Sequence, residues 1–250
     1  MDEFEIERTG SVELTDPVLV EGLPGVGHVG KLAAEHLLKE LKSDLVGRIY
    51  STHFPPQVGV EEGLTELANA ELHTITADEA ELLVVTGNHQ ARDAPGHYGL
   101  AETVLDVAED AGVREVYTLG GIPTGELIEE YDVVAAATTE DKRTALEDRG
   151  LVEFREGEPA GGIVGVSGLL LGLGDRRSIP AACLMGETSG YLVDPKSARA
   201  VLEVLQDVLG FEIEFDSLEQ RAEEMEAVVR KIQEMDDGAA AAEEDLRYIG

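Results

Sequence analysis

The stretch PVLVEGLPGVGHVGKLAAEHLLKELK, residues 17–42, decides the fold class of the chain. Residues 17–22 form a short apolar run of the kind that makes a buried strand. A glycine-rich turn follows, and leucines then recur on one stripe of residues 31–42, which is the pattern of an amphipathic helix. The stretch therefore predicts a strand, a tight turn and a helix, which together form the repeating unit of an α/β fold.

The same alternation continues outward along the chain. Strands are predicted at residues 45–51, 81–86, 115–119, 133–137 and 181–185, a hairpin or meander at 57–76, and helices at 100–111, 140–149 and 195–209. Asp194 is the expected N-cap of the last helix and Pro195 its first residue. We therefore expect residues 1–210 to form one domain, a three-layer α/β/α sandwich with a mostly parallel sheet.

Residues 211–237 are predicted to form a C-terminal amphipathic helix. Its apolar residues follow spacings of four and three, and they are Leu218, Ala222, Met225, Val229 and Ile232. The stripe has two interpretations, packing on its own domain or self-association. In the second, Met225, Val229 and Ile232 lie at an interface between subunits. Two heptads are too few to decide between them.

The charge of the chain restricts its partners. Asp and Glu number 52 against 19 Lys and Arg, which gives a formal net charge of −33. Such a charge repels phosphate backbones and anionic lipid surfaces, so we expect no nucleic-acid partner and no membrane partner. The acids are spread over the whole chain, which indicates a halophilic protein that works in concentrated salt, where self-repulsion is screened.

Cysteine and histidine usage bears on compartment and metal chemistry. Cys183 is the single cysteine, and the first residues are acidic and polar, so we expect a cytoplasmic protein without a disulfide or a secretory leader. Cys183 lies in an apolar run and is interpreted as a buried small side chain. The spacing of His89, Asp93 and His97 would suit a metal ion only if all three lay on one helix. Pro95 favours a loop instead. We therefore expect no metal site.

The glycine-rich turn allows two hypotheses. Gly25, Gly27 and Gly30 match G-x-G-x-x-G between a strand and a helix, and such a turn with His28 could hold a phosphorylated ligand or a nucleoside. The next strand lacks the acid at its end that a dinucleotide site requires. The other hypothesis is that the glycines permit a tight turn and close packing of helix on sheet. Neither a Gly-Lys-Ser/Thr motif nor a catalytic constellation occurs.

A series of motifs resembles the proteasome assembly chaperone superfamily. The series starts with the strand and turn at 17–30 and continues with VYTLGG at 116–121, the glycine-rich stretch 161–174, RSIP at 177–180 and LMGET at 184–188. The resemblance covers about residues 17–235, and the acidic composition indicates a haloarchaeal member. It implies a fold similar to nucleoside phosphorylases without their catalytic set, no cofactor, and a non-enzymatic, ATP-independent chaperone that forms homo-oligomers.

The resemblance also implies a partner and a binding segment. Archaeal relatives engage proteasome α-type subunits through C-terminal segments that contain an apolar residue, a tyrosine and one further residue. Residues 238–250 are expected to form a flexible acidic tail with an apolar tip. That tip consists of Leu246, Arg247, Tyr248, Ile249 and Gly250. Its tyrosine is third from the end rather than second, so we expect a variant of the activator mode of docking.

Overall fold

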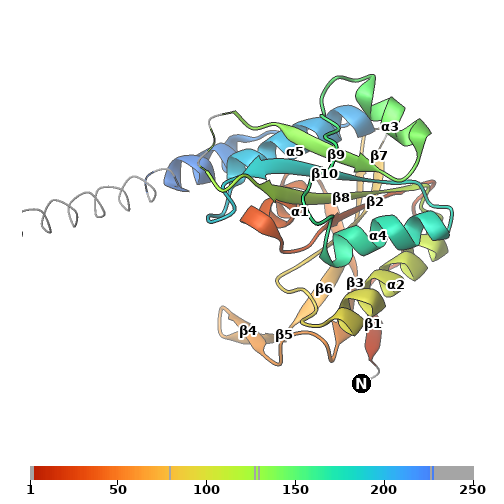
Figure 1. Cartoon of the computed structure of the whole chain (residues 1–250). Helices are drawn as coiled ribbons and strands as arrows, with labels where there is room; N and C mark the ends of the chain where they lie inside the picture. Colours follow the sequence, from red (N-terminus) through yellow and green to blue (C-terminus); the bar gives the residue numbers. More distant parts are fainter. Residues whose placement is uncertain (1–2, 79, 127, 129, 226, 228–250) are drawn as a thin grey trace, which may run out of the picture.

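The computed structural model describes residues 3–225 and residue 227, apart from 79, 127 and 129. An eight-stranded sheet forms its centre, in the order β1-β3-β6-β7-β2-β8-β10-β9, and helices cover both faces of this sheet (Figure 1). The strands are β1 (Phe4–Arg8), β2 (Val18–Gly22), β3 (Ser43–Ser51), β6 (Asn69–Ala77), β7 (Ala80–Gly87), β8 (Glu115–Pro123), β9 (Val133–Ala137) and β10 (Ala181–Thr188). The expected α/β/α sandwich is confirmed.

The middle of the sheet is parallel and its margins are antiparallel. The pairs β7–β2, β2–β8 and β8–β10 are parallel, whereas β9 and the strands beyond β7 pair in antiparallel fashion. Two successive antiparallel pairings give β3 the same direction as β7, so five of the eight strands point the same way. The side of the sheet where β2, β3, β7, β8 and β10 end is called the carboxyl edge below.

Each face of the sheet carries its own layer of helices. One face packs against α1 (Val29–Glu40), α3 (Glu140–Glu147) and α5 (Pro195–Leu209). The other face packs against α2 (Ala94–Asp110) and α4 (Gly165–Arg176). Because both faces are covered, every residue of β2 is buried, as its continuous apolar run predicted.

Local sequence explains where several helices begin and end. The Asp194 carboxylate accepts a hydrogen bond from the Ser197 N–H at 3.1 Å, which confirms the expected cap of α5. The Asp93 carboxylate caps α2 in the same way by accepting from the Gly96 N–H at 2.8 Å. Helix α2 therefore begins at Ala94 rather than near Leu100, because a proline in the first turn is compatible with a helix.

The hairpin expected within residues 57–76 is present as β4 (Val58–Glu61) and β5 (Leu64–Leu67), which form a separate two-stranded sheet at the carboxyl edge (Figure 1). Two other features depart from the expected elements. The glycine-rich stretch after residue 161 forms helix α4. Strand β1 was not expected, and it pairs with β3. Among the described residues, no helix has both the length and the apolar character needed to cross a bilayer.

Candidate functional site

The glycine-rich turn after β2 is packed closely against the sheet. It contains the 3-10 helix η1 (Val26–His28) and the start of α1. A Cβ atom on Gly30 would lie 2.0 Å from the carbonyl oxygen of Leu119 in β8, and one on Gly22 would lie 2.3 Å from the Gly30 carbonyl oxygen. These distances leave no room for a side chain, so the glycines bring α1 into contact with the strands.

The geometry of the turn favours the packing hypothesis over the ligand hypothesis. The Gly27 carbonyl accepts a hydrogen bond from the Asp194 N–H at 2.9 Å, which ties the turn to the start of α5. Gly25 and His28 face solvent, and His28 adopts a left-handed conformation with φ of 53°. The turn is therefore closed toward the sheet, while His28 lies outside on the surface rather than within a phosphate-sized recess.

Beneath the turn, polar side chains form a row across three strands. Glu21 of β2 is paired in register with Thr118 of β8, which is paired with Cys183 of β10. All three side chains are buried on the face that α2 and α4 cover. The sequence marked Cys183 as a buried small side chain, and burial raises the pKa of its thiol to about 12, so the thiol is not a nucleophile.

Glu21 is the unusual member of this row. Burial raises the pKa of its carboxyl group from 4.5 to about 7, against the opposing effects of hydrogen bonds from the Leu23 N–H and the Ser167 hydroxyl. The first of these bonds measures 2.8 Å, and the second oxygen atom, Oε2, has no partner. Sequence reasoning missed Glu21 because one acid at the end of an apolar strand gives no sign of its depth.

The expected loop histidines do not converge on one point. His97 Nδ1 lies 2.8 Å from the Asp93 carbonyl oxygen, and His89 lies beside Gln57. Asp93 instead accepts a hydrogen bond from His53 Nδ1 at 2.7 Å, and Glu3 accepts one from His53 Nε2 at 2.9 Å. The bond with Glu3, followed by that with Asp93, raises the pKa of the half-buried His53. Within the described part of the chain, no group of side chains is arranged to hold a metal ion.

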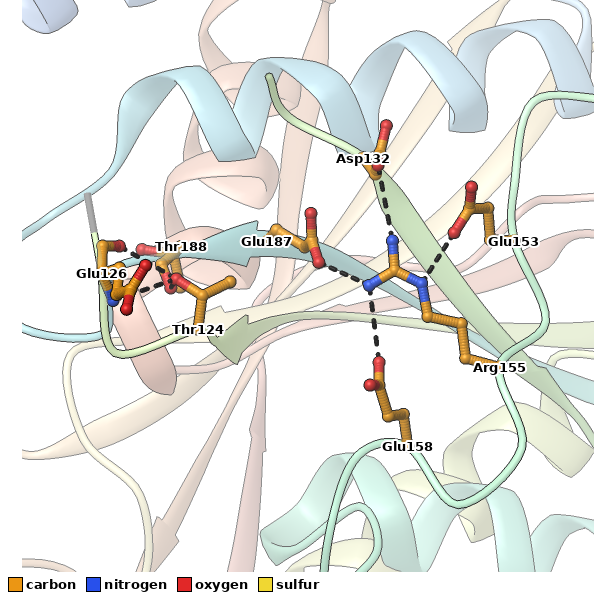
Figure 2. A network of polar contacts seen from close by, with 8 residues as sticks. All are labelled: Thr124, Glu126, Asp132, Glu153, Arg155, Glu158, Glu187 and Thr188. Atoms are coloured by element: carbon orange, nitrogen blue, oxygen red, sulfur yellow. Dashed lines mark hydrogen bonds and ion pairs between the residues drawn. The ribbon is translucent and has the colours of Figure 1, made fainter. Parts of the chain in front are cut away.

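Acidic side chains crowd around the few arginines on the surface. Figure 2 shows four carboxylates directed at the guanidinium group of Arg155. They belong to Glu187, Glu153 (2.7 Å), Asp132 (3.4 Å) and Glu158 (3.5 Å). These bonds, that to Glu187 above all, raise the pKa of Arg155, and they tie the segment after α3 to β10. Arg177 is likewise shared by Glu102, Asp106 and Glu109 of α2. Each cluster therefore keeps a surplus of negative charge.

Exposed apolar side chains gather at the carboxyl edge. The exposed large hydrophobic residues among those described are Val26, Val58, Val60, Leu64, Leu67, Tyr98, Val164, Tyr191 and Leu151. Those other than Leu151 and Val164 lie in a turn, a helix start or the β4–β5 hairpin that follow the ends of the strands at this edge. Val164 is the residue before α4, whose first residue, Gly165, lies beside Gln90 at this edge. Exposed apolar side chains gathered at one edge are typical of interaction surfaces, so this edge is the candidate functional site.

The helix that begins at residue 216 runs toward the same end of the molecule (Figure 1). Leu218 and Ala222 are buried, and Leu218 belongs to the core beside α1 and α5. Met225 is half-buried. The other residues expected at an interface, Val229 and Ile232, lie outside the described residues, as does the whole segment 246–250.

These observations define an acidic α/β/α sandwich protein with an apolar edge suited to contacts with other proteins. The family model described as the PAC2 family matches residues 19–233, and the chain belongs to this family. The expected resemblance to the proteasome assembly chaperone superfamily is thereby confirmed.

Three relatives illustrate the similarity. The uncharacterized protein MJ1210 of Methanocaldococcus jannaschii is 42% identical over 245 residues, which are 95% of this chain and 93% of the relative. The crystal structure of Pyrococcus furiosus PbaB, described as an archaeal proteasome activator, has a TM-score of 0.88 at 40% identity and covers 93% of this chain and 100% of that one. Pyrococcus furiosus PbaA, described as an archaeal homolog of proteasome-assembly chaperone, has a TM-score of 0.77 at 27% identity, with 96% of each chain covered.

Proposed function

We propose that this protein is an ATP-independent chaperone or adaptor of the proteasome, which binds α-type subunits partly through the segment Leu246–Gly250. The observation that carries the proposal is the similarity of nearly the whole chain to PbaB, at 40% identity and a TM-score of 0.88. The similarity to PbaA supports the same role, since that protein is described as a homolog of an assembly chaperone.

The anchoring of the last described helix and the composition of the residues after it support the use of this segment for binding. Leu218 and Ala222 anchor the last described helix to the domain, so the chain that follows starts from a fixed point. Residues 236–245 are acidic, glycine or alanine, and Leu246, Tyr248 and Ile249 then add apolar groups. Tyrosine suits such contacts because it buries a large area and has few rotatable bonds.

The geometry of the glycine turn argues against nucleotide chemistry in this role. The chain contains no Gly-Lys-Ser/Thr motif for binding the phosphates of ATP. Gly22 and Gly30 are needed to bring the helix against the sheet, and His28 faces solvent. We therefore propose a role without catalysis, in place of the alternative enzyme that would act on a nucleoside or a phosphorylated ligand at Gly25–Gly30.

Concentrated salt is the proposed working environment. With 52 acids against 19 bases, one arginine serves three or four carboxylates in the clusters of Arg155 and Arg177. The remaining repulsion is screened when the Debye length falls to about 3 Å near 1 M salt. This supports a halophilic protein in the cytoplasm of a salt-accumulating cell.

Removal of the segment tests the proposal directly. A variant lacking Leu246–Gly250 is expected to lose binding to immobilised proteasome α subunits in about 3 M KCl, measured by biolayer interferometry. Tyr248→Ala is expected to weaken binding about thirty-fold, because loss of one aromatic anchor costs roughly 2 kcal/mol. Leu151→Ala is the control, since it removes an exposed large apolar side chain of the folded domain outside the carboxyl edge. Unchanged binding by the deletion variant would move the interface to the globular domain.

A further inference from the structure

His53 connects three elements of the fold at the carboxyl edge. It follows β3, whose last residue is paired with Phe4 at the start of β1. Its Nδ1 atom lies 2.7 Å from the carboxylate of Asp93, which caps α2. Its Nε2 atom lies 2.9 Å from the carboxylate of Glu3, the residue before β1. One imidazole ring therefore joins the end of β3, the start of β1 and the start of α2.

Both ring nitrogens of His53 need a proton to hold the two carboxylates. A carboxylate only accepts hydrogen bonds, and an imidazole ring has two N–H donors when it is charged but one when it is neutral. The bond to Glu3 above all, then the bond to Asp93, raises the pKa of His53, while burial opposes them. The pair of bonds is therefore complete only when the ring is charged.

Two further ionisable side chains adjoin this site from the start of α2. They are those of Arg92, whose N–H donates to the His53 carbonyl oxygen at 3.1 Å, and His97, whose Nδ1 atom lies 2.8 Å from the Asp93 carbonyl oxygen. Neither of them supplies a carboxylate. Glu3 and Asp93 are therefore the acids that decide how the His53 ring titrates.

Loss of the ring proton breaks the bond to Glu3 and keeps the bond to Asp93. Asp93 also accepts a hydrogen bond from the Gly96 N–H at 2.8 Å, and this bond above all lowers its pKa. Its carboxylate therefore stays charged and fixed on α2, and the one N–H of a neutral His53 ring points to it. The lone pair of Nε2 then faces the Glu3 carboxylate, and two acceptors 2.9 Å apart repel each other.

The start of β1 has few other attachments that could compensate. The strand has five residues and lies at the end of the sheet, paired with β3 on one side. The Ser51 hydroxyl donates to the Glu3 carbonyl oxygen at 2.8 Å. Phe4 stacks on the His53 ring with centroids 5.7 Å apart, and it lies against the backbone of Gly99 in α2. Movement of Glu3 therefore disturbs the ring stack and the first pair of β1 with β3 together.

We propose that His53 is a proton-controlled clamp for the N-terminal strand β1. The charged ring holds Glu3 and Asp93 together and fixes β1 at the edge of the sheet, against α2. Loss of the proton releases Glu3, and β1 then loosens from its first residues, which uncovers the backbone edge of β3 and the face of α2 at Gly99. The clamp is complete below pH 6.5, the usual pKa of the ring, and it is lost as the pH rises through the raised pKa of the folded protein.

Hydrogen exchange of the full chain in about 3 M KCl tests the clamp. Exchange of the β1 backbone is followed by mass spectrometry between about pH 6 and about pH 9, and each rate is divided by that of an unstructured peptide at the same pH. The protection of residues 4–8 is expected to fall as the pH rises above 6.5. The fall is expected to be about ten-fold for each unit by which the pKa of His53 is raised.

Three variants distinguish the clamp from a purely structural contact. Glu3→Gln is expected to make the protection of β1 independent of pH in this range, because an amide can accept from the charged ring and, once turned, donate to the neutral one. His53→Gln is expected to remove the fall as well, because glutamine does not titrate. Glu5→Gln is the matched control, since it makes the same change on an exposed side chain of β1, and it is expected to retain the fall.

The outcomes separate loosening of β1 from unfolding of the whole domain. Strand β6 is paired on both sides, so its exchange reports unfolding of the domain. A fall in β1 that exceeds the change in β6, and that Glu3→Gln abolishes, supports the clamp. Constant protection of β1 in the wild type, an equal fall in β1 and β6, or a full fall in Glu3→Gln overturns it. The experiment contains no α subunits, so its result is independent of the proposed role of residues 246–250.

Discussion

Replacement of Glu21 by Gln is expected to be more favourable to the stability of the protein above neutral pH than in mild acid. The carboxyl group is fully buried, its Oε2 atom has no hydrogen-bond partner, and its pKa is about 7 against 4.5 for the exposed group. Glutamine retains the carbonyl oxygen that can accept from the Leu23 N–H, but it cannot ionise. The substitution therefore removes a buried charge and keeps most of the packing.

The sign and size follow from proton linkage. The folded state holds the proton of Glu21 to a higher pH than the unfolded state does. The stabilisation that comes from this stronger proton binding is fully present below pH 4.5. It is lost as the pH rises through about 7. A shift of about 2.5 pKa units corresponds to about 3 kcal/mol. The amide nitrogen of the introduced glutamine lacks an acceptor at every pH, so its cost does not alter this pH dependence.

Urea denaturation at high salt measures the effect. Unfolding free energies of the wild type and Glu21→Gln are compared at pH 4.5 and pH 8, and the difference between the two proteins is expected to shift by about 3 kcal/mol in favour of the variant at pH 8. Glu5→Gln, an identical chemical change on an exposed side chain of β1, is expected to show no comparable shift. Equal differences at both pH values for Glu21→Gln would refute the assignment of a raised pKa to this carboxyl group.

Two further predictions concern the turn and the salt requirement. Gly30→Ala is expected to lower the unfolding free energy by about 3 kcal/mol or more, because its Cβ would lie 2.0 Å from the Leu119 carbonyl oxygen. Gly25→Ala, which has no neighbour within 4 Å and an extended backbone, is expected to be nearly neutral, and thermal unfolding of the pair checks both. The midpoint of thermal unfolding is also expected to rise steadily from about 0.1 M to 3 M KCl, as screening relieves repulsion among the 52 acids. A midpoint independent of salt would count against the halophilic interpretation.

Local patterns determined a large part of the fold. The apolar run of β2, the glycine turn and the leucine stripe of α1 each depend on neighbours within a few residues, so they can be read without knowing the strand order. The Asp194 cap of α5 is equally local. The sequence pattern predicts the start of α2 too late, because Pro95 and Gly96 suggest a loop. The cap by Asp93 stabilises a helix that begins before them, at Ala94.

Helix α4 and strand β1 depended on tertiary contacts. The glycines of α4 give it a weak intrinsic preference for helix, and burial of Val166, Leu170 and Leu171 against the sheet stabilises it. Strand β1 is ordered by pairing with β3, which lies far along the chain, and Phe4 stacks on the His53 ring. A short window of sequence around β1 contains neither β3 nor His53.

The sequence by itself determined the α/β class, the net charge and the apolar composition of residues 246–250. Only the tertiary structure brought Glu21, Thr118 and Cys183 into one register, and only it gathered the ends of β2, β7, β8 and β10 at one edge of the sheet. The physical reason is the strand order β7-β2-β8-β10, which places segments from distant parts of the chain side by side. That order results from the packing of whole layers, and no local pattern of residues encodes it.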